Sequence, residues 1–195
     1  MMPDRIRAFV ALRLSAEVER AVAEFIESLR PAGNAHGAMR WVRRTNLHLT
    51  LRFLGDRVEA SVLERLDGAL VRIAATTARF TIGVRGIGAF PNLARPRVVW
   101  VGLESAELIA LAASIERAAI ESGLAPERRS YTPHLTIGRL RDLDQWDAMR
   151  PAIEAAASRD FGRSAALSMI LYRSILAIDS ATHEELAQYS FGGGG

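Results

Sequence analysis

The sequence contains no cysteine and no lysine among its 195 residues. The absence of cysteine excludes disulfide bonds, a cysteine nucleophile and thiolate metal ligands. The absence of lysine excludes a lysine nucleophile, including the lysine that ATP-dependent ligases adenylate. No apolar run is long enough to span a bilayer, and the first residues lack the long apolar segment of a secretion signal. These absences favour a cytoplasmic protein with no membrane partner.

The composition is otherwise that of a folded protein. Hydrophobic residues make up 49% and charged residues 24% of the chain, which is enough apolar material for a core and argues against wholesale disorder. All 25 basic residues are arginine, and 22 acidic residues leave a net charge of only +3. This total charge gives weak support for a nucleic-acid partner, although guanidinium groups suit phosphate. The length fits one domain or two small lobes that share a cleft.

Hydrophobic periodicity predicts strands and helices without strict alternation, so we expect an α+β fold with mainly antiparallel sheets. One helix begins after the N-cap Ser15 and ends at Pro31; another begins after Ser105 and ends at Gly123. The remaining helices are predicted over 60–75 and, broken at Pro151, over 143–158. We predict strands over 6–13, 46–54, 79–89, 97–103, 131–138, 165–173 and 185–191. Residues 1–191 would form one domain, and 192–195 a flexible glycine tail.

Two short segments share the pattern His-x-Thr followed by an apolar residue. The first contains His48 and Thr50, and the second contains His134 and Thr136. Both segments are strand-like, and residues i and i+2 of a strand point to the same face. Each segment therefore presents an imidazole and a hydroxyl on one face, opposite leucine or isoleucine on the other.

Paired units of this kind suit phosphoryl transfer. In-line displacement at phosphorus needs a base near the attacking oxygen and an acid near the leaving oxygen, and histidine can serve as either near neutral pH. Threonine hydroxyls can donate to the non-bridging phosphate oxygens. A single strand histidine is usually a surface or core residue, but two matching units are far less expected by chance. Zinc is the competing interpretation; no carboxylate stands at a ligand-like spacing within either motif, so we predict no metal and no other cofactor.

The chain resembles the 2H phosphoesterase superfamily, and within it the RNA 2′,3′-cyclic phosphodiesterases, also called 2′-5′ RNA ligases. The similar segments occur in order between about residue 5 and about residue 190, and cover residues 7–11, 41–42, 46–51, 53–55, 86–91, 97–103, 131–139 and 171–174. The resemblance implies a bilobal fold with a pseudo-twofold axis. Each lobe would contribute one His-x-Thr strand to a central cleft, with the helices outside.

The resemblance also implies a role for each matching residue. His134 would be the general base that activates water, and His48 the general acid that protonates the ribose 3′ oxygen, leaving the phosphate on the 2′ oxygen. Thr50, Thr136 and Arg139 would bind the phosphate. Strict strand alternation places Arg139 on the face opposite His134, so this role requires a bulge, twist or strand end near Gly138, where the family commonly has alanine.

Other residues are weaker candidates. Arg43 and Tyr131 could contact substrate, although a solvated loop is an equal interpretation for Arg43. Trp41 and Phe90 are aromatic residues that could stack on a base. Phe53 and Trp100 are predicted to lie in the core, because Phe53 shares strand parity with neighbouring leucines and Trp100 lies in a valine-rich run. His36 and His183 have no motif around them and are interpreted as surface residues.

The expected activity is hydrolysis of RNA 2′,3′-cyclic phosphate ends without a metal ion, by a monomer. Candidate substrates include tRNA halves and small cyclic nucleotides. The same site could run in reverse as a 2′-5′ RNA ligase, with a ribose hydroxyl in place of water. A nucleotide-binding module without turnover is the third interpretation, and the presence of both histidines argues against it.

Overall fold

The structure is a computed structural model that describes residues 4–33, 39–143, 146–177 and 181–192. In chain order its elements are β1 (Arg5–Leu12), α1 (Ala16–Gly33), β2 (Met39–Trp41), the 3₁₀ turn η2 (Arg44–Asn46), β3 (Leu49–Glu59), α2 (Ala60–Thr76), β4 (Phe80–Phe90), β5 (Val98–Glu104), α3 (Ala106–Glu121), β6 (His134–Leu140), α4 (Trp146–Ala155), β7 (Asp160–Ala166), β8 (Ser168–Leu176) and β9 (Ala181–Ser190).

The strands form two antiparallel sheets. One has the order β3-β1-β8-β9, and the other has the order β2-β6-β5-β4-β7. In each sheet, two neighbouring antiparallel strands have a helix in the segment that joins them: α1, followed by β2 and η2, lies between β1 and β3, and α3 lies between β5 and β6. The repeated unit explains why the two His-x-Thr segments occupy similar positions, and the expected α+β fold with mainly antiparallel sheets is confirmed.

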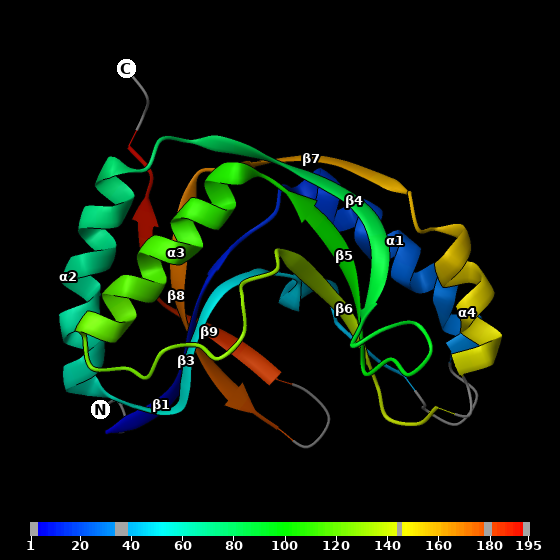
Figure 1. The fold of residues 1–195 in the computed structure, drawn as a ribbon, viewed down its shortest axis with the longest axis horizontal. Helices are drawn as coiled ribbons and strands as arrows, with labels where there is room; N and C mark the ends of the chain where they lie inside the picture. The colour runs from blue at the N-terminus through cyan, green and yellow to red at the C-terminus, as the bar shows by residue number, and fades with distance from the viewer. Residues whose placement is uncertain (1–3, 34–38, 144–145, 178–180, 193–195) are drawn as a thin grey trace.

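The helices lie outside the two sheets (Figure 1). Helices α2 and α3 pack together and contact β3, whereas α1 and α4 pack together and contact β7 and β4 respectively. One continuous apolar core includes residues of both sheets and of these helices, among them Val10, Val22, Leu66, Val101, Ile115 and Met149. Burial of this size is the main source of stability and fixes the sheets as platforms for the site.

Helix boundaries follow local capping chemistry. The backbone N–H of Val18 lies 3.5 Å from the Ser15 hydroxyl oxygen, and Leu108 N–H donates to Ser105 at 3.2 Å. Gly123 has φ +101°, a conformation that favours glycine, and it follows the end of α3. These three predictions are confirmed.

Three boundary predictions were wrong. Helix α1 continues past Pro31 to Gly33, and α4 runs through Pro151 as one helix, because Met149 and Ile153 on either side of that proline are both buried in the core. The strand expected over 165–173 is two strands, β7 and β8, in different sheets. No turn residue separates them, so the apolar pattern shows no break. The short strand β2 was not predicted.

The C-terminus and the helices provide two further observations. Gly192, expected in the tail, donates its backbone N–H to the carbonyl of Ala74 at 3.1 Å, and residues 193–195 lie outside the described part. No helix within the described ranges has the length and apolar character needed to cross a membrane.

Candidate active site

The two His-x-Thr segments meet at one cavity of about 460 Å³ between the sheets. His48 and Thr50 line it from the first sheet, with His48 directly before β3, and His134 and Thr136 line it from β6. The prediction that these two segments, far apart in the chain, contribute to one cleft is confirmed.

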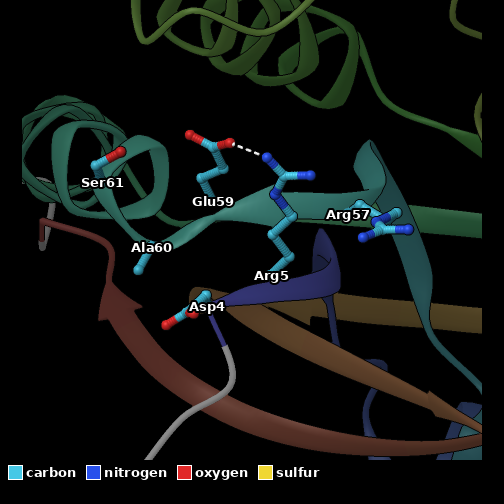
Figure 2. A pocket seen from close by; sticks show the side chains of 6 residues that line it. All are labelled: Asp4, Arg5, Arg57, Glu59, Ala60 and Ser61. Carbon is cyan, nitrogen blue, oxygen red and sulfur yellow. Dashed lines mark hydrogen bonds and ion pairs between the residues drawn. The ribbon is translucent and has the colours of Figure 1, made fainter.

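A larger and more open hollow of about 660 Å³ lies where β1 and β3 meet the start of α2 (Figure 2). Its charged side chains are mixed in sign, and Arg5 and Glu59 pair across it at 2.7 Å. No histidine lines this hollow, and its opposite charges neutralise one another, so the smaller cavity is the candidate site.

Both motif histidines are oriented by the same hydrogen bond. Nδ1 of His48 donates to the carbonyl oxygen of Asn46 at 2.7 Å, and Nδ1 of His134 donates to that of Thr132 at 2.7 Å. A carbonyl oxygen can only accept, so each neutral ring carries its proton on Nδ1. The Nε2 atom of each ring is thereby left free to exchange a proton with a ligand.

The electrostatic environment favours neutral histidines in the free protein. Burial is the main cause that lowers the pKa of His48 to about 4, with smaller lowering contributions from His183 and Arg139, while the Asn46 hydrogen bond acts in the raising direction. Burial also lowers the pKa of His134, and Arg139 adds to that lowering against the raising effect of Thr132. An anionic ligand would oppose these effects and favour imidazolium.

A β-bulge directly after each threonine decides which later side chains reach the cavity. In β3, Val10 pairs with Arg52 and Ala11 with Thr50, so Leu51 is an extra residue. In β6, Val99 pairs with Gly138 and Trp100 with Thr136, so Ile137 is extra. Each bulge reverses the alternation that follows it.

The bulges turn Phe53 and Arg139 toward the cavity, which both line. The prediction that Phe53 lies in the core holds only in part: it is partly buried against the cluster that contains Phe9 and Tyr172, but it also lines the cavity, because the alternation that was assumed is broken at Leu51. The bulge that the role of Arg139 required is present. At Gly138, a Cβ atom would lie 2.8 Å from the sulfur of Met39, so the absence of a side chain lets β2 approach.

Positive charge dominates the cavity. Arg7, Arg40, Arg43 and Arg139 line it, and no carboxylate does so within the described ranges. Arg40 and Arg139 are direct cross-strand partners, an arrangement of like charges that is unfavourable without an anion nearby. This charge distribution suits a phosphorylated ligand.

His183 lies in the cavity as well, so its interpretation as a surface residue was wrong. Its ring meets His48 edge to face with a centroid separation of 4.9 Å, and Phe9 lies 5.0 Å from it. Burial first, and Arg7 second, lower its pKa. Sequence spacing gave no signal, because β3 and β9 are opposite edge strands of the first sheet and come together only through tertiary contacts, such as the hydrogen bond from the Asn46 side chain to the Ala181 carbonyl at 2.7 Å.

Aromatic rings also support His134. Phe90 meets its ring edge to face at 5.0 Å and packs on Trp100 at 5.2 Å. Trp100 is half-buried against Gly88, where a Cβ atom would lie 2.3 Å from the indole ring. The prediction that Trp100 belongs to the buried core was wrong; it shares a face with Thr136, its cross-strand partner.

Of the weaker candidate residues, some line the cavity and others do not. Arg43 and Trp41 line the cavity, whereas Tyr131 does not and instead packs against the core with a buried hydroxyl. Burial raises the pKa of Tyr131. His36 lies outside the described residues.

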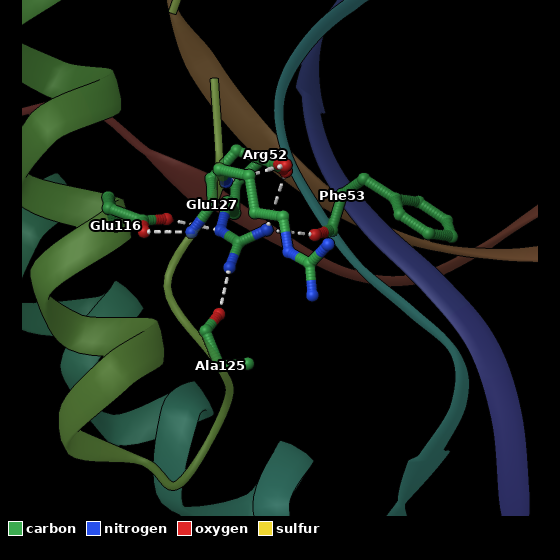
Figure 3. A network of polar contacts seen from close by, with 6 residues as sticks. Arg52, Phe53, Glu116, Ala125 and Glu127 are labelled. Atoms are coloured by element: carbon green, nitrogen blue, oxygen red, sulfur yellow. Dashed lines mark hydrogen bonds and ion pairs between the residues drawn. The ribbon is translucent and has the colours of Figure 1, made fainter. Parts of the chain in front are cut away.

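A buried arginine connects the two motif segments (Figure 3). Arg52 of β3 pairs with Glu116 of α3 and with Glu127 at 2.9 Å, and it donates to the carbonyl of Ala125 at 2.6 Å. Glu127 belongs to the segment that leads into β6. The network thus fixes the approach to the second motif against the strand of the first.

Comparison with known proteins supports one family. The sequence profile of the 2′-5′ RNA ligase superfamily matches residues 18–167. A Thermotoga maritima protein named RNA 2′,3′-cyclic phosphodiesterase is 31% identical over 196 residues, covering 97% of each chain. A Methanocaldococcus jannaschii protein of the same name is 29% identical over 184 residues, covering 94% of this chain and 100% of the relative.

A solved structure agrees in fold. The crystal structure of E. coli LigT complexed with 3′-AMP superposes with a TM-score of 0.74 at 28% identity, covering 96% of this chain and 98% of LigT. Together with the profile match over most of the chain, this similarity shows that the protein belongs to the 2′-5′ RNA ligase superfamily of 2H phosphoesterases.

Proposed function

We propose that this protein hydrolyses the 2′,3′-cyclic phosphate at the end of an RNA and leaves a 2′-phosphomonoester. The observation that carries the proposal is the pair of histidines whose Nε2 atoms are free, in a cavity lined by arginines. Similarity to proteins named RNA 2′,3′-cyclic phosphodiesterase supports the same substrate class.

In the proposed reaction, Nε2 of His134 accepts a proton from water as the water oxygen attacks phosphorus. The bond between phosphorus and the 3′ oxygen breaks, and Nε2 of His48 gives its proton to that oxygen. The two histidines end with exchanged protonation states and are reset through solvent. No bond to the protein forms.

Charge that develops on the phosphate needs donors already in place. Thr50 and Thr136 supply hydroxyls from the two strands, and Arg139 supplies a guanidinium that suits planar, bidentate contact with phosphate oxygens. Arg43, at the same cavity, is proposed to contact the RNA.

The low pKa of His48 in the free protein is compatible with an acid role only once substrate is bound. A phosphate anion beside the ring favours imidazolium and raises that pKa, which opposes the effect of burial. Substrate binding and proton uptake are therefore coupled in this proposal.

Microscopic reversibility allows the same groups to join RNA ends. A ribose hydroxyl would replace water as the nucleophile, and tRNA halves are candidate substrates for that direction. We further propose a monomer acting in the cytoplasm, which sedimentation and cell fractionation would test; a stable dimer or a membrane-bound fraction would contradict this part.

The deciding experiment incubates EDTA-dialysed protein with adenosine 2′,3′-cyclic phosphate and identifies the product by ³¹P NMR. Adenosine 2′-phosphate is expected at an undiminished rate, because no group of three or more His, Cys, Asp or Glu side chains in the described ranges is placed to hold a metal ion. A folded His48→Ala, His134→Ala double variant is the control for contaminating phosphodiesterase. No turnover, a 3′-phosphate product, or activity restored only by added zinc or manganese would contradict the proposal.

A further inference from the structure

Three polar residues form a row across the first sheet, on the face that borders the cavity. Ser174 and His183 are direct partners on β8 and β9. One step beyond the Ala8 and Arg173 pair, the antiparallel register places Arg7 of β1 beside Ser174. All three line the cavity, and the catalytic roles proposed above use none of them.

Each member of this row has polar capacity left for a ligand. Ser174 is only 8% exposed, and its hydroxyl has no hydrogen bond to any residue in the described ranges. Nδ1 of His183 is buried without a partner there, so the ring is free to carry its proton on Nε2 and act as a donor. This state contrasts with His48 and His134, whose Nδ1 atoms are fixed by carbonyls.

Arg7 is held in position by contacts that leave part of its guanidinium group free. Its guanidinium carbon lies 4.4 Å from the centroid of the Phe53 ring, and Nη1 pairs with Asp56, whose side chain is 70% exposed. A guanidinium has five N–H donors, so the Asp56 contact leaves others for a ligand. Burial and the charge of Arg139 lower the pKa of Arg7, as expected for two cations that face one partly dry cavity.

The row of Arg7, Ser174 and His183 lies next to the histidine that is proposed to protonate the leaving 3′ oxygen. The ring of His183 is 4.9 Å from that of His48, the proposed acid for the 3′ oxygen. In a ribose, C3′ is bonded to C4′, which carries C5′ and its phosphate. A nucleotide whose 3′ oxygen meets His48 therefore extends its 5′ phosphate past His48, where the row begins.

We propose that Arg7, Ser174 and His183 form a second anion subsite, which binds the phosphate on the 5′ side of the terminal nucleotide. The inference rests on the proposed function and on His48 as the acid. A cyclic phosphate carries one negative charge, whereas four arginines line the cavity. A second phosphate in the same cavity gives the ligand the charge that this lining suits. The enzyme then prefers an RNA end to a free nucleoside cyclic phosphate.

The test compares kcat/KM at fixed ionic strength for three substrates: adenosine 2′,3′-cyclic phosphate, the same compound with a 5′-phosphate, and a dinucleotide ending in the cyclic phosphate. The 5′-phosphate is expected to raise kcat/KM by roughly 10- to 100-fold, as expected for charge-assisted hydrogen bonds, and the dinucleotide by a similar factor. Arg7→Gln should reduce the ratio between phosphorylated and unphosphorylated substrate towards one.

Arg57→Gln is the matched control, because Arg57 is an exposed arginine of β3 that lies outside the cavity. It should keep the wild-type ratio. If Arg7→Gln does not fold, Ser174→Ala and His183→Gln provide the same readout, each with a smaller fall in the ratio.

The outcomes separate the two proposals. No hydrolysis of any substrate would overturn the proposed function itself. Hydrolysis of all three with equal kcat/KM would overturn the subsite alone. A gain seen only with the dinucleotide would also overturn it, since the neighbouring nucleoside and not the phosphate would then be bound. If Arg57→Gln lowers the ratio as much as Arg7→Gln does, the preference for the 5′-phosphate comes from the overall charge of the protein, and the subsite is overturned.

Discussion

His48 and His134 are held by equivalent hydrogen bonds, each from Nδ1 to the carbonyl oxygen two residues earlier at 2.7 Å. The equivalence follows from two His-x-Thr strands in two similarly connected sheets. It leaves two Nε2 atoms at one cavity, so the rings can act on opposite sides of a phosphorus atom.

Replacing either histidine should remove most of the activity. We expect His48→Ala and His134→Ala each to lower kcat on a 2′,3′-cyclic nucleotide by about 10²–10⁴, the usual contribution of one acid or base. Circular dichroism and the unfolding midpoint check that each variant folds. Turnover near the wild-type rate in either folded variant would refute the two-histidine mechanism.

The division of roles has its own test in the leaving group. A substrate with a much better leaving group than ribose needs little help from an acid, so it should rescue His48→Ala more than His134→Ala. The measurement is the ratio of variant to wild-type kcat/KM for both substrates. Rescue confined to His134→Ala would show that the acid and base are reversed, and equal rescue would not fit this assignment.

The pH dependence should differ between the free protein and the complex. His134 must be neutral and His48 protonated, which gives a bell-shaped kcat/KM profile. Both pKa values are lowered from their usual value of 6.5 in the free protein, so the maximum is expected on the acidic side of pH 6.5. The two apparent pKa values of this profile describe the coupled pair of histidines and not either residue alone. Bound phosphate raises both pKa values, so the kcat profile should lie at higher pH; a kcat/KM maximum on the alkaline side of neutrality would contradict this.

The sequence predicted those helix ends and strand faces that depend only on residues close together in the chain. Ser15, Ser105 and Gly123 mark helix ends by hydrogen bonds or backbone conformation within a few residues, and these predictions hold. The His-x-Thr pattern likewise needs only the two-residue period of a strand. Both motif segments therefore lie at the cavity as expected.

The missed features depend on pairing between distant segments. Phe53 was assigned to the wrong face because the bulge at Leu51 exists only in the register of β3 against β1. The equivalent bulge at Ile137 places Arg139 at the cavity. His183 joins the site only through tertiary contacts between β9 and the segment before β3, which lie at opposite edges of the first sheet. None of these relationships has a signature in the neighbouring residues.

The Arg52 network should contribute measurably to stability. Arg52→Met would remove the ion pairs with Glu116 and Glu127 and the donors to the carbonyls of Phe53 and Ala125, so we expect a loss of about 2–3 kcal/mol in the free energy of unfolding. Urea denaturation measures this loss. Arg57→Met, on the exposed part of the same strand, should change stability by no more than about 0.5 kcal/mol. Equal effects in the two variants would mean that the buried network adds nothing.

Arg139 should act on both phosphate binding and proton transfer, and two substitutions separate these effects. Its charge lowers the pKa of both His48 and His134, so Arg139→Gln should raise both values and move the whole kcat/KM profile to higher pH. The loss of a charged donor should also lower kcat/KM by roughly 10- to 100-fold. Arg139→Lys keeps the charge but loses the guanidinium fork, so it should reduce kcat/KM while leaving the profile near its original pH. If both variants shift the profile equally, or neither does, the charge of Arg139 does not set the protonation of the histidines.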